Sequence, residues 1–247
     1  MISTELILYA TAVYLMAGII KGTVGIGLPT AAIGILSQFT EPRVAISLVV
    51  FPILVSNAWQ VFREGKIVET FVTYWRLALA LMPVLIMTTF VTASIDTETL
   101  MLILGMVIFL FAASSLLLKP KPLPDRFNHA AQIFAGTTAG ILGGLTAIWA
   151  PPIIIYLMAR GVEKNDFVRV TGVLLFAGGV SLCIGFWQAG LLTSSNALFS
   201  LGLVIPTLLG FSLGEILRRR LNSQRFRTLV LMVFLLMGLN LIRKAIL

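Results

Sequence analysis

A lone lysine lies inside a glycine-rich segment of an otherwise apolar run near the start of the chain. Lys21 is followed in this segment by Gly22, Thr23, Gly25, Gly27 and Pro29. Glycine permits backbone turns that other residues resist, and proline suits the first turn of the helix that follows. The N-terminus of such a helix presents free N–H groups and a positive dipole end, which attract anions. We therefore expect this break to bind a small anion, with Lys21 adding a full positive charge.

A related break occurs about half a chain later. It contains the residues Gly143, Gly144, Thr146, Trp149 and Pro151. Adding 122 to Gly22 and to Pro29 gives Gly144 and Pro151, and adding 123 to Pro83 gives Pro206. This near-constant offset predicts a duplication within a single transmembrane domain: repeat one at 1–118, a proline-rich linker at 119–127 and repeat two at 128–247.

The composition is that of an integral membrane protein. The mean hydropathy is +1.02, 58% of the residues are hydrophobic and only 11% are charged, which exceeds what a soluble domain of this length can bury. Eight apolar stretches are long enough to cross a bilayer as helices. They lie at about 5–20, 44–62, 71–94, 99–118, 130–148, 170–187, 196–217 and 226–242.

Lysine and arginine positions predict how these helices are arranged. If the segments 5–39 and 128–158 each enter the membrane and return, 13 of the 18 basic residues fall on one face. That face should be cytoplasmic. Each repeat then holds one broken or re-entrant hairpin and three transmembrane helices, so repeat two is inverted relative to repeat one. Two short full spans in place of each hairpin give the same parity, and that alternative stays open.

Further polar residues within or near the apolar stretches are candidates for the same site. Asn57 and Gln60 share a helix face by their spacing of three, and Gln188 matches Gln60 in repeat two. We expect these amides to donate hydrogen bonds to the anion. Arg43 and Arg169 precede matching helices and are candidates for gating or for attracting the anion. The alternatives are that the glycines only allow close helix packing, that Lys21 reaches an interface, and that both arginines are solvated loop ends.

Several classes of function lack sequence support. The chain has one histidine and one cysteine, and it contains no metal-ligand motif, nucleotide-binding loop or catalytic set. We therefore expect no enzymatic activity, no cofactor and no metal site. The net charge of +8 follows from the basic loops and does not indicate nucleic-acid binding. The expected partners are a small anionic substrate and the lipid bilayer.

Several of these segments resemble the sulfite exporter TauE/SafE family of bacterial membrane permeases. The resemblance rests on the first glycine-rich stretch ending at Leu28-Pro29, on Ser56–Gln60, on Gly140–Pro152, on Pro206 with Gly210 and Gly214, and on the final segment Arg225–Leu247. It implies transport of sulfite, a sulfonate or a related sulfur or carboxylate anion across the bacterial inner membrane.

Together these observations predict a secondary transporter that moves a small anion, such as sulfite or an organosulfonate, by alternating access. An anion channel and a non-transporting membrane assembly subunit are the alternatives. The sequence leaves open export against import, a proton or another coupling ion, and assembly as a homodimer.

Overall fold

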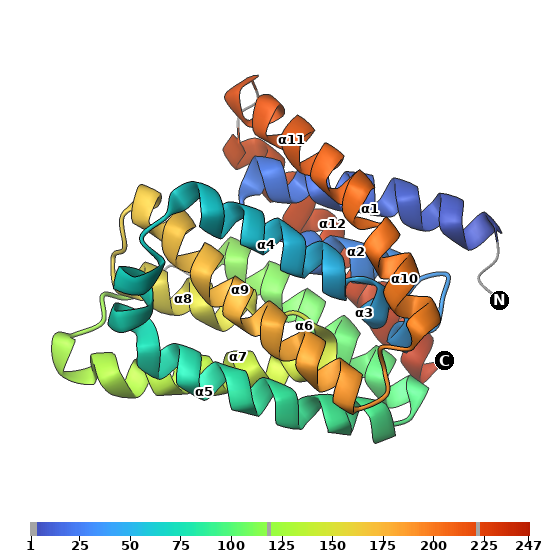
Figure 1. The fold of residues 1–247 in the computed structure, drawn as a ribbon, viewed down its shortest axis with the longest axis horizontal. Coiled ribbons are helices and arrows are strands. Elements are labelled where there is room, and N and C mark those ends of the chain that lie inside the picture. The colour runs from blue at the N-terminus through green and yellow to red at the C-terminus, as the bar shows by residue number, and fades with distance from the viewer. Residues whose placement is uncertain (1–3, 118–119, 221–222) are drawn as a thin grey trace. The chain divides into compact units, whose positions relative to one another are not determined.

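The computed structural model of the protein describes residues 4–117, 120–220 and 223–247, and these residues are almost entirely helical. Lys119, the first residue of the predicted linker, lies outside the described residues. The elements in chain order are α1 (Thr4–Val24), α2 (Leu28–Leu36), α3 (Pro42–Leu48), α4 (Val50–Glu64), α5 (Ile67–Ser94), α6 (Thr97–Leu117), the 3₁₀ turn η1 (Asp125–Phe127), α7 (Asn128–Thr146), α8 (Ala150–Ala159), α9 (Lys164–Gln188), α10 (Ser194–Gly202), α11 (Val204–Arg220) and α12 (Ser223–Ile246) (Figure 1).

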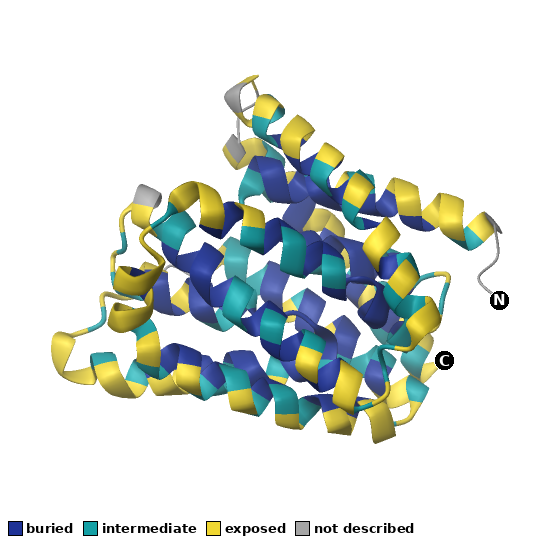
Figure 2. Ribbon diagram, in the orientation of Figure 1, coloured by how far each residue is buried: buried dark blue, intermediate teal, exposed yellow. Residues whose placement is uncertain are grey.

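The predicted all-α membrane fold is confirmed. Within the described ranges, seven helical stretches are long and apolar enough to cross a membrane. They include α3 with α4 as one stretch, Pro42–Glu64, and α10 with α11 as another, Ser194–Arg218. Their outward faces carry many exposed apolar side chains, whereas the faces between packed helices are buried (Figure 2). This distribution suits lipid, which solvates apolar side chains. The inverted repeat and its boundaries stay a prediction.

Two compact units make up the chain, and each draws helices from both predicted repeats. Unit 1 comprises Met1–Ser56, Asp96–Leu117 and Thr193–Leu247, and unit 2 comprises Asn57–Ile95 and Leu118–Leu192. In unit 1, α1 packs on α11 and α12 packs on α6; in unit 2, α7 and α9 both pack on α5. The first helix of each predicted repeat therefore packs against a helix of the other repeat.

Unit 1 contains a broken helical hairpin formed by α1 and α2. The chain turns back between Val24 and Leu28, and the Phe39 ring after α2 stacks on Tyr9 near the start of α1, with ring centroids 6.2 Å apart. With its 9 residues, α2 is about 14 Å long, roughly half the thickness of a bilayer core. Its C-terminal end is fixed to α12, because Lys244 donates to the Gln38 carbonyl over 2.6 Å. Such a hairpin enters and leaves on the same side of the unit.

Unit 2 contains a second broken hairpin, formed by α7 and α8. The Tyr156 hydroxyl near the end of α8 donates a 2.7 Å hydrogen bond to the side chain of Asn128, the first residue of α7. Just beyond α8, Arg160 donates to the Leu123 carbonyl and pairs with Asp125 at 2.8 Å. With 10 residues, α8 is also about half a bilayer core in length. Both predicted breaks are therefore turns that join a long helix to a half-length one.

Candidate functional site

The first break occupies only three residues, Gly25–Gly27. Gly25 and Gly27 have φ values of 91° and 98°, a left-handed conformation that is costly for residues with a Cβ atom. Pro29 stands in the first turn of α2, as expected. A Cβ atom at Gly25 would have nothing within 4 Å, so its backbone is open to close approach. Gly22 and Thr23, by contrast, lie within α1.

Replacing Gly27 with alanine tests how far this turn depends on its backbone conformation. An added Cβ atom would meet its nearest neighbour, Ile20, at 3.5 Å, an ordinary contact, so the cost comes from the positive φ alone. We expect Gly27→Ala to lower the free energy of unfolding by about 1–2 kcal/mol. Gly27→Asn should cost less, because asparagine tolerates this region better. Chemical unfolding in detergent measures both, and an alanine variant as stable as the native protein contradicts the expectation.

Lys21 is buried in the last turn of α1. Its side chain is 3% exposed, Nζ donates to the Ser56 hydroxyl over 2.9 Å, and it lies 5.9 Å from the centre of the Phe211 ring. Ser56 is eight residues before the end of α4 at Glu64, which places it about 12 Å inside that helix end. Lys21 therefore does not reach a surface, and the structure surrounds it with a hydroxyl and an aromatic face.

Gly22 and Thr23 contact α11 and do not line the turn. A Cβ atom at Gly22 would lie 2.2 Å from the Phe211 carbonyl oxygen, and the Thr23 hydroxyl lies 2.8 Å from the Ile19 carbonyl and 3.2 Å from that of Gly214. These contacts match the alternative that small residues allow close helix packing. A role of either residue in binding substrate stays a prediction.

The second break lies at the level of the middle of α9. Ala147 ends α7 with φ 56°, and Pro151 stands in the first turn of α8. The Trp149 ring is 2% exposed and lies against Gly178, where a Cβ atom would be 2.4 Å from the indole nitrogen. The Thr146 hydroxyl donates to the Leu142 carbonyl over 2.7 Å and faces the Ile148 amide at 3.3 Å, so it stabilises the end of α7.

Gly143 and Gly144 serve the packing of α7 in unit 2. A Cβ atom at Gly144 would lie 2.5 Å from the Leu85 carbonyl oxygen of α5, and one at Gly143 would lie 2.9 Å from the Trp149 Cβ. Across the same interface the Thr92 hydroxyl donates to the Gly144 carbonyl over 2.7 Å. The close helix pair of unit 2 thus repeats the combination of glycines and a threonine hydroxyl found between α1 and α11.

The three predicted amide donors do not lie together. Gln60 is buried and donates to the Val168 carbonyl over 2.8 Å, near the start of α9. Gln188 is exposed at the end of the same helix. The 20 residues from Val168 to Gln188 span about 30 Å of helix, so these glutamines cannot contact one ligand in unit 2. Asn57 is buried at 3% exposure in the middle of α4.

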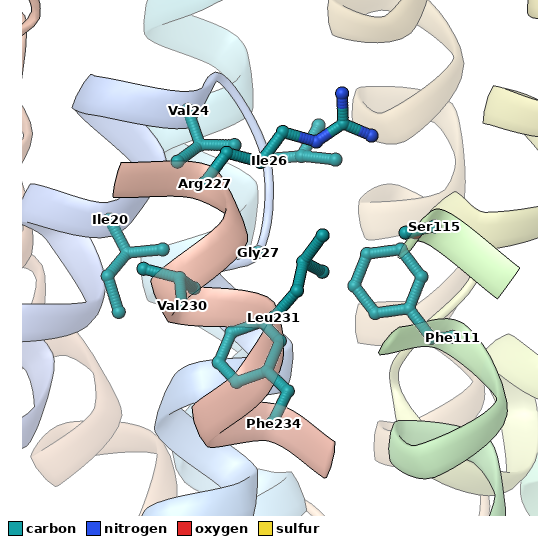
Figure 3. A pocket seen from close by; sticks show the side chains of 10 residues that line it. All are labelled: Ile20, Val24, Ile26, Gly27, Phe111, Ser115, Arg227, Val230, Leu231 and Phe234. Atoms are coloured by element: carbon teal, nitrogen blue, oxygen red, sulfur yellow. The ribbon is translucent and has the colours of Figure 1, made fainter. Parts of the chain in front are cut away.

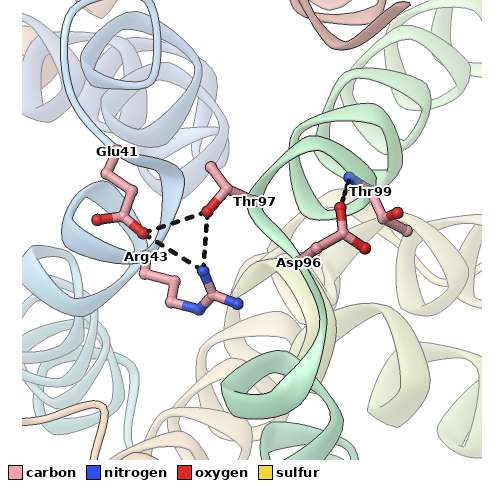
Figure 4. Close-up of polar contacts among 5 residues, drawn as sticks. All are labelled: Glu41, Arg43, Asp96, Thr97 and Thr99. Atoms are coloured by element: carbon pink, nitrogen blue, oxygen red, sulfur yellow. Dashed lines mark hydrogen bonds and ion pairs between the residues drawn. The ribbon is translucent and has the colours of Figure 1, made fainter.

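Arg43 and Arg169 both stand near helix starts in ionic clusters. Arg169 is 15% exposed and pairs with Asp166 at 3.0 Å and with Glu69 at 3.9 Å. Arg43 lies 3.3 Å from Glu41 and 3.1 Å from the Thr97 hydroxyl, which joins the starts of α3 and α6 (Figure 4). Neither arginine is a freely solvated loop end, and a gating role stays a prediction.

Asp96 caps α6 beside this cluster. Its carboxylate accepts a 2.8 Å hydrogen bond from the Thr99 amide (Figure 4), and this bond holds the pKa of Asp96 below its usual value. Because the folded pKa is the lower one, the stabilisation is fully present above the ordinary aspartate pKa and is lost as pH falls through the folded value. Asp96→Ala should therefore lower the thermal midpoint at pH 7 and flatten its decline between about pH 5 and pH 3. Thermal unfolding across this range is the measurement, and parallel curves for both proteins contradict the expectation.

A narrow pocket lies beside the first break within unit 1 (Figure 3). Its walls include Ile20, Gly27, Phe111, Ser115, Arg227 and Phe234. The residues that α6 and α12 contribute to this pocket were not identified from the sequence. A signal was present, because Arg227, Val230, Leu231 and Phe234 follow the i, i+3, i+4, i+7 spacing of one helix face.

The described residues contain no group of three or more histidine, cysteine, aspartate or glutamate side chains placed to hold a metal ion. What the site presents is a buried ammonium, a hydroxyl, and the N-terminus of a half-length helix. These groups suit an anion.

Comparison with known proteins assigns the family. No curated protein and no solved structure matches the chain. The family model described as sulfite exporter TauE/SafE matches residues 10–241, a range that includes all or most of each hairpin and of each of the seven apolar stretches. This family consists of membrane permeases and not of enzymes. The chain therefore belongs to the sulfite exporter TauE/SafE family of multi-pass membrane proteins.

Proposed function

We propose that the protein is a secondary transporter that moves a small anion, sulfite or an organosulfonate, across the bacterial inner membrane by alternating access. Family membership supports a transporter of sulfur-containing anions. The observation that carries the proposal is the burial of Lys21, at 3% exposure, in the helix that leads into the break before a half-length helix. A charge at this depth is costly and marks an ion pathway in membrane proteins.

The residues of unit 1 supply the contacts that an oxyanion needs. The Lys21 ammonium provides charge, and the Ser56 hydroxyl, 2.9 Å away, provides a hydrogen-bond donor once the ammonium turns to the ligand. The first N–H groups of α2 have no partner within their own helix and carry the positive end of its dipole. Gly25 leaves its backbone open to approach. An anion bound here would offset the cost of the buried ammonium.

The remaining predicted contacts belong to the same proposal. Trp149 and Pro151 belong to the corresponding break in unit 2, where the indole nitrogen is buried without a hydrogen-bond partner among the described residues. Gln60 and Asn57 are buried within α4, and their role in binding stays a prediction. That both breaks act on one substrate stays a prediction.

Counterflow in proteoliposomes tests the proposed function. Vesicles loaded with unlabelled sulfite or methanesulfonate should take up labelled anion faster than empty vesicles, and uptake should saturate with concentration. A channel would instead give currents that follow the electrochemical gradient without counterflow. Vesicles inert to every sulfur anion, formed from folded protein that retains a fixed membrane partner on purification, would favour an assembly subunit.

A further inference from the structure

The pocket beside the first break is lined by both apolar and polar side chains, and Lys21 is not among them (Figure 3). Phe111, Leu231 and Phe234 form an apolar wall, and the two rings lie 6.4 Å apart between centroids. Arg227, half-buried, extends across the mouth beside Ile26. The pocket therefore combines a cation at its opening with an apolar interior.

Arg227 has its charge available for a ligand. Across the ranges that the structure describes, its guanidinium makes no ion pair and no hydrogen bond. Ser115 lines the same pocket from α6 and is the other polar side chain in it. A guanidinium and a hydroxyl facing one space are suited to a sulfonate or carboxylate head group, whose oxygens accept from both.

The interior limits the size of what it can hold. The space between the lining side chains is about 280 Å³ including the open mouth, and the enclosed part holds about one water molecule. A methyl or methylene group needs a similar space. An inorganic anion would leave the apolar wall without a matching group, and a chain of four carbons would have to displace aromatic side chains.

We propose that this pocket is a subsite for a short-chain organic anion, with its sulfonate or carboxylate head on Arg227 and Ser115 and a tail of one or two carbons against Phe111 and Phe234. The inference rests on the proposed anion transport and narrows its substrate class. Because Gly27 forms part of the pocket wall, an anion held here lies next to the N-terminus of α2. Arg227 would thus bind and select organic anions before they reach the Lys21 site.

A chain-length series tests the interior of the pocket. Calorimetric titration of the purified protein with methanesulfonate, ethanesulfonate and butanesulfonate should show affinity rising about threefold to fourfold from the first to the second, as for one more buried methylene group. Butanesulfonate should bind at least tenfold more weakly than ethanesulfonate. Leu231→Ala removes part of the apolar wall and so enlarges the pocket, and it should reverse this order in favour of butanesulfonate. A flat or steadily rising series that Leu231→Ala does not change would overturn the proposal.

Arginine variants test the head-group contact. Arg227→Gln should weaken ethanesulfonate binding about tenfold or more, the usual effect of losing a charged hydrogen bond, while Arg227→Lys should lose less. Arg225→Gln is the matched control, because it removes the same charge from the same helix two residues away and does not line the pocket. Equal losses in Arg225→Gln and Arg227→Gln would show a general charge effect and would overturn the subsite.

The outcomes separate this inference from the proposed function. Normal ethanesulfonate binding by Arg227→Gln, together with loss of anion binding by a Lys21 variant, would remove the subsite and leave the transporter proposal in place. Native mass spectrometry tests whether the pocket binds a lipid instead of a short organic anion. An anionic lipid that is retained by the native protein, lost in Arg227→Gln and not displaced by ethanesulfonate would assign the pocket to a lipid and overturn the inference.

Discussion

Replacing Lys21 with methionine should weaken binding of sulfite or methanesulfonate by about 10- to 100-fold, because it removes a charged hydrogen-bond donor from a buried site. The substitution keeps most of the side-chain volume. Removing a buried charge is often neutral or stabilising when an apolar group of similar size replaces it. We therefore expect the variant to fold and to unfold at the native temperature or above. Calorimetric titration and thermal unfolding of the purified protein measure the two effects separately.

Two further variants make the Lys21 result specific. Lys21→Arg keeps the charge and should retain part of the affinity. Lys244→Met makes the same chemical change on α12, where the ammonium is exposed and bonded to the Gln38 carbonyl, and it should leave binding unchanged. Native affinity in a folded Lys21→Met protein would rule out the proposed binding role. If that variant does not fold, Ser56→Ala tests the same pair, and it should weaken binding about threefold to tenfold.

Replacing Gly22 with alanine should destabilise the protein by more than the usual 1–3 kcal/mol of an overpacked core site. The new Cβ atom would lie 2.2 Å from the Phe211 carbonyl oxygen and 3.0 Å from the Glu215 amide nitrogen. Both are backbone atoms, so α1 and α11 would have to separate. The helix propensity gained by alanine, about 1 kcal/mol, does not offset this. The thermal midpoint should fall by about 6–12 °C or more.

Gly202→Ala provides the matched control for this prediction. Gly202 ends α10 with no atom within 4 Å of the added Cβ and no positive φ, so its midpoint should stay within about 2 °C of the native value. The same pair of variants decides between packing and ligand contact at Gly22. A Gly22→Ala protein of native stability that binds the anion weakly would contradict packing and support a direct contact with the ligand.

The local features of both breaks could be predicted from the sequence. Pro29 and Pro151 stand in first helical turns, as their fixed φ and missing N–H favour. The positive φ at Gly25 and Gly27 requires glycine whatever surrounds it. The apolar runs have the length of a bilayer core and form helices because a backbone in lipid must satisfy its own hydrogen bonds. Each of these features depends on a few consecutive residues, so the chain itself specifies it.

The lateral arrangement of the helices was decided only by the tertiary structure. Lys21 contacts Ser56 and Phe211, and Gly22 contacts α11 and not the turn. Gln60 contacts the start of α9, whereas Gln188 is the last residue of that helix. In a soluble helix the polar face shows which side is buried, but a membrane helix is apolar on every side. Its sequence therefore does not show which face meets lipid and which meets another helix. Arg227 lines the pocket beside the first break because α12 packs there, and only the tertiary structure shows this contact.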